Sequence, residues 1–128
     1  MECKKDFQID RKKEMMAVHD AMDVLSGKWK IYILSSICHY NKRRFSDILE
    51  DVVGISNKML SKELKELEVN KLIRRTVLDT QPITVQYELT EHGQTLKTIV
   101  NDLTDWGFAH RKEIMGEIEQ STKISERV

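Results

Sequence analysis

The apolar residues of the chain recur mainly at helical spacing. Steps of three and four positions between apolar residues predict amphipathic helices over 15–25 and 91–118. Between 28 and 38 the apolar residues cover more than one helix face, which predicts a central helix packed by several neighbours. A shorter helix is predicted over 44–49. The pattern therefore favours a mainly helical protein.

Two strands interrupt the helical pattern between residues 72 and 90. Residues 72–78 are typical of a strand, and Val85, Tyr87 and Leu89 alternate with polar residues. The sequence Asp79-Thr80-Gln81-Pro82 between them is typical of a turn. The predicted fold class is thus mainly α with a small antiparallel β-hairpin (α+β).

The helix predicted over 57–69 has two chemically different faces. At about 100° per residue, Leu64 and Leu67 fall within about 40° of Leu60. Lysine and serine occupy the opposite side, at Lys58, Ser61, Lys62 and Lys65. Ser56, which follows the break at Gly54, is placed to cap the first free amides of this helix.

Length and composition fit one globular domain. The chain has 128 residues, of which 40% are hydrophobic and 33% charged. We expect a polar leader over 1–14, a domain over 15–118 and a polar tail over 119–128. Its apolar runs are far shorter than the roughly 20 residues that cross a bilayer. The charged N-terminus also lacks a signal-peptide pattern, so we expect a cytoplasmic protein without membrane contact.

The charges are balanced overall but not along the chain. Lysine plus arginine and aspartate plus glutamate both number 21, which gives a formal net charge of zero. Residues 42–75 nevertheless hold nine basic and six acidic residues, a local charge of +3. A phosphate-binding face needs only local positive potential, so neutrality does not exclude a nucleic-acid partner.

The order of elements predicts a winged helix-turn-helix. A short helix, a tight break and a helix with a polar outer face are followed directly by a hairpin, the wing. Lysines on that face can neutralise phosphates, and asparagine can pair with adenine. The candidate DNA-contacting residues of the two helices are Arg43, Arg44, Ser56, Asn57, Lys58, Ser61, Lys62 and Lys65. The alternative is an ordinary solvated lysine face, although the like charges of Lys58 and Lys62 on adjacent turns favour phosphates opposite them.

The sequence contains no pattern of catalytic or metal-binding residues. The four histidines lack metal-ligand spacing, and Ser26-Gly27-Lys28 is too short for a phosphate-binding loop. Neither an enzyme nor a bound cofactor or metal is therefore expected. Cys38 lies in an apolar run and is interpreted as a small buried hydrophobic residue. Cys3 lies in the polar leader and is a candidate redox-sensing thiol.

Five motifs in order resemble one family of bacterial regulators. They are Ser26-Gly27-Lys28-Trp29-Lys30, Arg44-Phe45-Ser46-Asp47-Ile48, Gly54-Ile55-Ser56-Asn57-Lys58-Met59-Leu60, Leu64-Lys65-Glu66-Leu67-Glu68 and Val85-Gln86-Tyr87-Glu88-Leu89-Thr90-Glu91-His92-Gly93. Over about residues 16–107 the chain resembles the HxlR-type winged helix-turn-helix regulators of the MarR-like superfamily.

The resemblance implies a homodimer that binds an inverted-repeat operator in double-stranded DNA and acts as a repressor or activator. Helix 57–69 would read the major groove, and the N- and C-terminal helices would form the dimer interface. The interface residues implied are Met15, Val18, Met22, Leu96, Ile99, Val100, Leu103 and Trp106. The alternative is that these apolar stripes are entirely intradomain core.

The chain departs from the family pattern at two places. Met16 stands where many members carry a cysteine, which weakens the case for a family-type thiol switch. Thr84 stands where many members carry a basic wing residue, and the tip from Asp79 to Ile83 has no lysine or arginine. Wing contacts would then come from the polar side chains of Thr80, Gln81 and Thr84.

Two further interpretations remain open at this level. The same scaffold could bind a protein partner instead of DNA. An unknown small-molecule or redox effector could also act, the former in a pocket between the dimer helices. Such a pocket, or equally an ordinary core, could be built from Trp29, Tyr32, Tyr40, Trp106, Met15, Met16 and Met22.

Overall fold

The computed structural model describes the backbone over residues 7–126 and the side chains over residues 10–116. Six helices and three strands follow one another along the described chain. They are α1 (Phe7–Leu25), α2 (Lys30–Tyr40), β1 (Lys42–Arg44), α3 (Phe45–Asp51), α4 (Asn57–Val69), β2 (Ile73–Leu78), β3 (Thr84–Leu89), α5 (Glu91–Gln94) and α6 (Lys97–Glu126).

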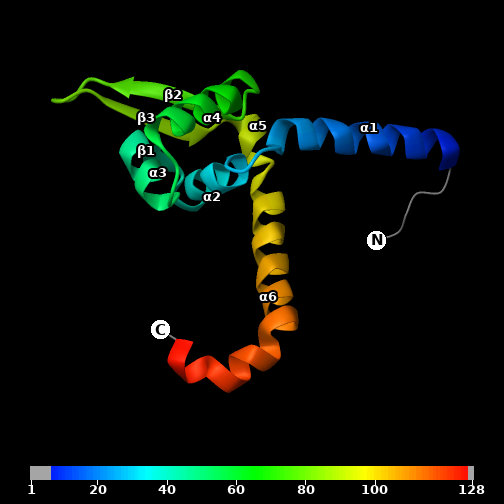
Figure 1. Ribbon diagram of the computed structural model, residues 1–128. Helices are drawn as coiled ribbons and strands as arrows, with labels where there is room; N and C mark the ends of the chain where they lie inside the picture. Colours follow the sequence, from blue (N-terminus) through cyan, green and yellow to red (C-terminus); the bar gives the residue numbers. More distant parts are fainter. Residues whose placement is uncertain (1–6, 127–128) are drawn as a thin grey trace.

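The predicted hairpin forms and belongs to a three-stranded sheet. The strand order is β1-β3-β2, and both pairings are antiparallel. Tyr87 on the central strand lies opposite Arg43 on one side and Arg75 on the other. The far ends of β2 and β3 extend beyond the helices as a free ribbon (Figure 1). This ribbon is the wing of a winged helix-turn-helix.

The core lies where α2, α3, α4 and the sheet meet. The three leucines predicted for the inner face of α4, Leu60, Leu64 and Leu67, are all buried, as are Ile33 and Ile37 of α2. They belong to one cluster that also includes residues from α3, β2 and β3. The buried face of α4 therefore agrees with the sequence prediction, and its polar face points outward.

The junction between wing and C-terminal helix depends on Gly93. The Thr90 hydroxyl accepts a hydrogen bond from the Gly93 amide at 2.9 Å and donates to the Lys71 carbonyl at 2.6 Å. A Cβ built on Gly93 would lie 2.0 Å from the Leu72 carbonyl oxygen. Only glycine allows this approach, which fixes α5 against the start of β2.

The continuous helix predicted over 91–118 is wrong at its start. The helix is interrupted at Thr95–Leu96, where the amides bond to the carbonyls three residues earlier, and α6 begins at Lys97. The Thr95 hydroxyl donates to the His92 carbonyl at 2.6 Å in this turn. The α6 backbone then continues to Glu126, through most of the predicted tail.

Two further features differ from the sequence prediction. Helix α1 begins at Phe7, within the segment interpreted as a leader. After α2, Asn41 adopts φ = 71° and the chain then pairs with β3 as β1, a strand that the sequence did not predict. Such short edge strands carry little sequence signal, since pairing with β3 creates them.

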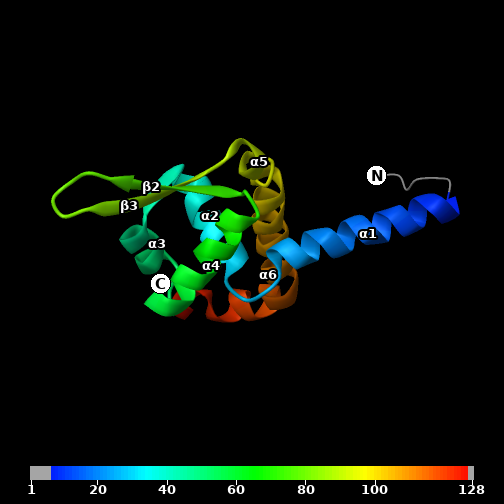
Figure 2. The same cartoon turned by 90° about the horizontal axis from the view of Figure 1, so that it is seen from above.

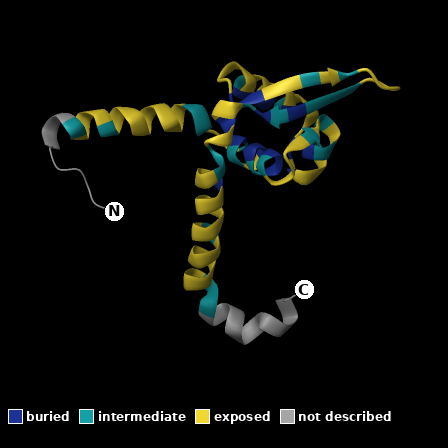
Figure 3. Ribbon diagram, turned by 180° about the vertical axis from the view of Figure 1, so that it is seen from behind, coloured by how far each residue is buried: buried dark blue, intermediate teal, exposed yellow. Residues whose placement is uncertain are grey.

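Helices α1 and α6 leave the winged body as two arms. Figures 1 and 2 show α1 pointing sideways and α6 running away from the sheet. Figure 3 shows both arms largely exposed, whereas buried residues concentrate in the body. Val24 and Leu25 at the end of α1 and Leu96 before α6 pack against the core and attach the arms. Among the described residues, no helix has the length and apolar character that a membrane span requires.

Candidate nucleic-acid interface

The outer face of α4 is a polar and basic surface. Ser56 caps the helix, because its hydroxyl accepts a hydrogen bond from the Met59 amide at 3.0 Å. The predicted contact residues that follow are all exposed: Asn57, Lys58, Ser61, Lys62 and Lys65. The inner leucines hold this face in a fixed orientation. The arrangement offers three ammonium groups and one amide to a ligand that approaches from solvent.

Arg44 lies at the start of α3 and is held by Asp47. Its Nε and Nη2 donate to the two carboxylate oxygens at 3.1 and 3.2 Å, and its backbone amide donates to Oδ2 at 3.2 Å. These hydrogen bonds lower the pKa of Asp47. Arg44 stays exposed, and three of its five N–H donors remain for a phosphate.

Arg43 does not belong to this surface. Its Nη2 donates to the Asp47 carbonyl at 3.1 Å and lies 3.5 Å from Asp51 Oδ2. Its guanidinium stacks 3.8 Å from the centre of the Tyr40 ring. The sequence placed Arg43 beside Arg44, but alternation along β1 turns the two side chains to opposite faces. Arg43 fixes α3 to the end of α2.

The wing tip satisfies its own hydroxyl groups. Thr80 Oγ1 lies 3.0 Å from Thr84 Oγ1, and both contact the Pro82 carbonyl, at 2.6 and 3.3 Å. Thr84 is therefore half-buried and engaged in the turn, which makes it a weaker candidate than predicted. Thr80 and Gln81 stay exposed.

A hollow of about 560 Å³ separates α4 from the wing. Ser61 and Lys65 line it from the helix, and Arg75 lines it from β2. Tyr87 forms part of its floor, and its pKa is raised by burial, against an opposing effect of Arg75. Lys65 of the helix and Arg75 of the wing thus face a common space, which the Glu68 carboxylate of α4 also lines.

Sequence reasoning missed an ion network behind α4. Lys30 Nζ lies 2.5 Å from Glu63 Oε1 and 2.6 Å from Glu66 Oε1. Glu66 also pairs with Lys62 at 3.3 Å, an i,i+4 pair that the sequence interpretation had overlooked. The sequence signal that could have revealed this network is Lys30 itself, because a lysine inside the most apolar helix of the domain needs an acidic partner.

The predicted dimer residues divide into two groups. Val100 is buried and Leu96 packs on the core, so these two contribute to the protomer's own interior. The other six predicted residues are exposed on α1 and α6: Met15, Val18, Met22, Ile99, Leu103 and Trp106. Met16, Phe108 and Ile114 extend the exposed apolar surface and were not predicted.

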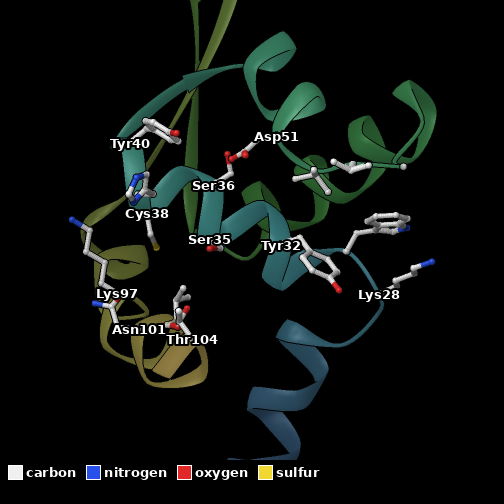
Figure 4. Close-up of a pocket in the computed structure, with 16 residues that line it drawn as sticks. Lys28, Tyr32, Ser35, Ser36, Cys38, Tyr40, Asp51, Lys97, Asn101 and Thr104 are labelled. Carbon is white, nitrogen blue, oxygen red and sulfur yellow. The ribbon is translucent and has the colours of Figure 1, made fainter. Parts of the chain in front are cut away.

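A cavity of about 960 Å³ lies between α2, the α3–α4 turn and α6 (Figure 4). Trp29, Tyr32 and Tyr40 line it, as three of the aromatic residues of the effector hypothesis. Trp106 and the α1 methionines are not among its lining residues. Cys38 lines it as a half-buried thiol, and burial raises its pKa. The Ser36 hydroxyl in its wall has no hydrogen-bond partner among the described residues.

The remaining sequence predictions concern Cys3 as a redox-sensing thiol and metal binding. Cys3 lies outside the described residues. Within the described residues, no cluster of three or more histidine, cysteine, aspartate or glutamate side chains has the geometry to hold a metal ion.

Comparison with known proteins assigns the fold. The model of the HxlR-like helix-turn-helix family matches residues 24–115. The HTH-type transcriptional regulator YtcD of Bacillus subtilis is 36% identical over 109 residues, which cover 85% of this chain and 86% of YtcD. A crystal structure of a ytcD protein superposes with a TM-score of 0.67 at 39% identity, over 73% of this chain and 94% of that one.

One redox regulator has the same fold. The structure of HypR in its reduced form superposes with a TM-score of 0.70 at 35% identity, over 78% of this chain and 98% of HypR. The family model, the sequence relatives and the winged body agree with the five motifs. The chain therefore belongs to the HxlR-like helix-turn-helix family and is an HTH-type transcriptional regulator, not an enzyme.

Proposed function

We propose that the protein binds an inverted-repeat operator in double-stranded DNA as a homodimer, with α4 in the major groove. The observation that carries the proposal is the exposed face of α4, where Asn57, Lys58 and Lys62 project from a helix fixed by its buried leucines. A helix of this diameter fits the major groove of B-form DNA. Arg44 would contact the backbone beside it.

The homodimer rests on the two arms. Their exposed apolar residues form a surface of the kind that marks interaction sites on soluble proteins. A second copy would cover both arms at once and place two α4 helices on one face of the duplex. Successive major grooves then require a separation of about 34–36 Å between them.

The test is to crosslink the tagged protein to DNA in its host and sequence the bound fragments. A recurring inverted repeat with half-sites about one helical turn apart is expected. On that site, Lys62→Ala should reduce the slope of log K against log salt by about 0.9 per lost phosphate contact. Glu50→Gln, on the exposed side of α3, serves as a control.

A lack of DNA binding would favour a second candidate function, that of a protein-binding module. A folded dimer that enriches no DNA and shows no salt-dependent affinity for a duplex contradicts the proposal. A protein-binding module would then account for the neutral net charge and for a wing tip without lysine or arginine.

We further propose that a small effector binds the cavity between α2 and α6. Aromatic faces from Trp29 and Tyr32, an ammonium group from Lys97 and the unpartnered Ser36 hydroxyl would suit a planar molecule with an acidic group. A redox effector acting on Cys38 is disfavoured, because its raised pKa opposes the reactive thiolate. Benzoate should raise the melting temperature of the wild type but not of Val100→Trp, whose indole would fill the cavity.

A further inference from the structure

Two carboxylates of α4 share one lysine of α2. Lys30 Nζ contacts Oε1 of both Glu63 and Glu66, at 2.5 and 2.6 Å. The side chains of Lys30 and Glu63 are only 8% and 9% exposed, whereas that of Glu66 is 43% exposed. Glu63 is therefore the buried counterion, and Glu66 is the outer member at the edge of the recognition face.

The second oxygen of Glu66 contacts a lysine on the exposed face of α4. Glu66 Oε2 lies 3.3 Å from Lys62 Nζ, one helical turn earlier on α4. The same carboxylate thus accepts a buried ammonium group on one oxygen and a solvent-exposed one on the other. A phosphate that binds Lys62 competes with Glu66 for the ammonium group, and Lys30 is then the cation that stays bonded to Glu66.

Charge counting shows why Lys30 matters for that exchange. Glu63 and Glu66 carry two negative charges, of which Lys30 neutralises one and Lys62 the other. Hydrogen bonds from Lys30 and then Lys62 lower the pKa of Glu66, so it stays ionised at neutral pH. Burial opposes the charge on Lys30, but its hydrogen bonds to both carboxylates raise its pKa overall.

We propose that Lys30 is a positioning residue for DNA binding, which holds the Glu66 carboxylate against α2 and so releases Lys62 to a phosphate. The inference rests on the proposed function of α4. Without Lys30, Glu66 would keep Lys62 as its sole cation within reach and would repel the DNA backbone.

The test uses the double variant Lys30→Met/Glu63→Gln in the full chain. It replaces the buried ion pair with neutral groups of similar size and leaves Glu66 facing Lys62 alone. The probe is a mixed-sequence 30-base-pair duplex, titrated at several salt concentrations. We expect a salt slope lower by about 0.9 per recognition helix and, at 0.1 M salt, a roughly tenfold loss of affinity per helix.

A third substitution separates positioning from a merely structural role. Adding Glu66→Gln to the double variant should restore the salt slope and the affinity, because no carboxylate then competes for Lys62. Adding Glu68→Gln instead removes the same charge from the exposed surface of α4 without contacting Lys30 or Lys62, and should restore neither. An unaltered double variant, or equal rescue by both substitutions, would overturn the proposal.

A single variant keeps the inference testable if the double variant does not fold. Glu66→Gln in the wild type leaves Lys30 paired with Glu63. Since Lys30 already holds the Glu66 carboxylate against α2, we expect less than a twofold change in affinity. A tenfold gain would show that Glu66 competes for Lys62 despite Lys30. A wild type without salt-dependent duplex binding would overturn the proposed function together with the inference, whereas wild-type binding with an unaltered double variant would overturn the inference alone.

Discussion

The winged body and the two arms use the same hydrophobic periodicity with opposite results. In α4, Leu64 is 1% exposed, whereas in α6 Leu103 is 47% and Trp106 64% exposed. Both helices carry apolar residues at steps of three and four. The difference is that α4 packs on α2 and the sheet, while the α6 stripe extends beyond the body (Figure 3). An apolar stripe thus shows that a helix has a face to cover, but not whether its own chain covers it.

The contrast has a functional consequence. The body orients the polar face of α4 within a single protomer, so its geometry does not depend on a partner. The arms leave their apolar surface to a second copy in the proposed dimer, which would set the distance between two α4 helices. Substitutions in the body should therefore affect folding, and substitutions in the arms should affect assembly.

The largest effect is expected at Gly93. Gly93→Ala places a Cβ 2.0 Å from the Leu72 carbonyl oxygen, so the backbone of the body must shift. We expect the free energy of unfolding to fall by about 3 kcal/mol, the upper part of the usual range for overpacking. Urea denaturation measures it. Gly116→Ala in the α6 arm is the matched control, because its Cβ meets no atom within 4 Å and should not destabilise the protein.

A charge in the α6 stripe should separate assembly from folding. Leu103→Glu is expected to weaken self-association by roughly 30-fold to 1,000-fold, the range of central interface residues, because it buries a carboxylate in the dimer. Sedimentation velocity gives the association state, and circular dichroism checks that the body keeps its helices. Thr98→Glu, an exposed change on the other side of α6, should leave the dimer intact. Equal dissociation by both variants would contradict the proposed interface.

A moderate effect is expected where α4 begins. Ser56→Ala removes the acceptor of the Met59 amide and should cost about 1 kcal/mol of unfolding free energy. Ser61→Ala, on the exposed face of the same helix, should stay within about 0.5 kcal/mol. Comparison of the two by thermal denaturation distinguishes the cap from the candidate DNA contact. A loss of DNA affinity in Ser61→Ala with unchanged stability would support a role of Ser61 as a DNA contact.

The smallest effect is the pH dependence of the body. Asp47 and Glu66 have pKa values below their ordinary 3.8 and 4.5 in the folded protein, so their stabilisation is complete above those values. This stabilisation is lost as the pH falls through the lowered pKa values that the two carboxyl groups have in the folded protein. Lys30 has a raised pKa, so its contribution is lost only as the pH rises above 10.5. Melting temperatures should therefore be flat near neutrality and fall below about pH 4, and Asp47→Asn should reduce this acid sensitivity.

Much of the site followed from local chemistry. The bounds of α4, its Ser56 cap and its leucine face were predicted correctly, because these features depend on neighbours within one or two helical turns. The hairpin was also predicted correctly, because its two strands are neighbours in the sequence and are joined by a short turn. The thiol Cys38 was expected to be buried and is half-buried beside a cavity, a difference that depends on how closely α6 approaches α2.

The misplaced residues all depend on contacts distant in sequence. The sequence prediction grouped Arg43 with Arg44 as DNA contacts. In the structure β1 pairs with β3, and the Arg43 side chain contacts Asp51 and Tyr40 instead. Val100 was assigned to the dimer stripe, yet packing of α6 on α2 buries it. Glu63 was not singled out in the sequence, and only the packing of α2 on α4 brings Lys30 to meet it.

By itself, the sequence determined the order of the main helices and of the hairpin, the two faces of α4 and the family, because periodicity, caps and motifs are local properties of the chain. The tertiary structure alone decided which charges face solvent and which apolar residues remain uncovered. Lys30 and Lys62 have the same side chain, but one is buried between two carboxylates and the other lies on the surface. That assignment depends on segments that meet only after folding, and burial and charge pairing then fix what each residue can do.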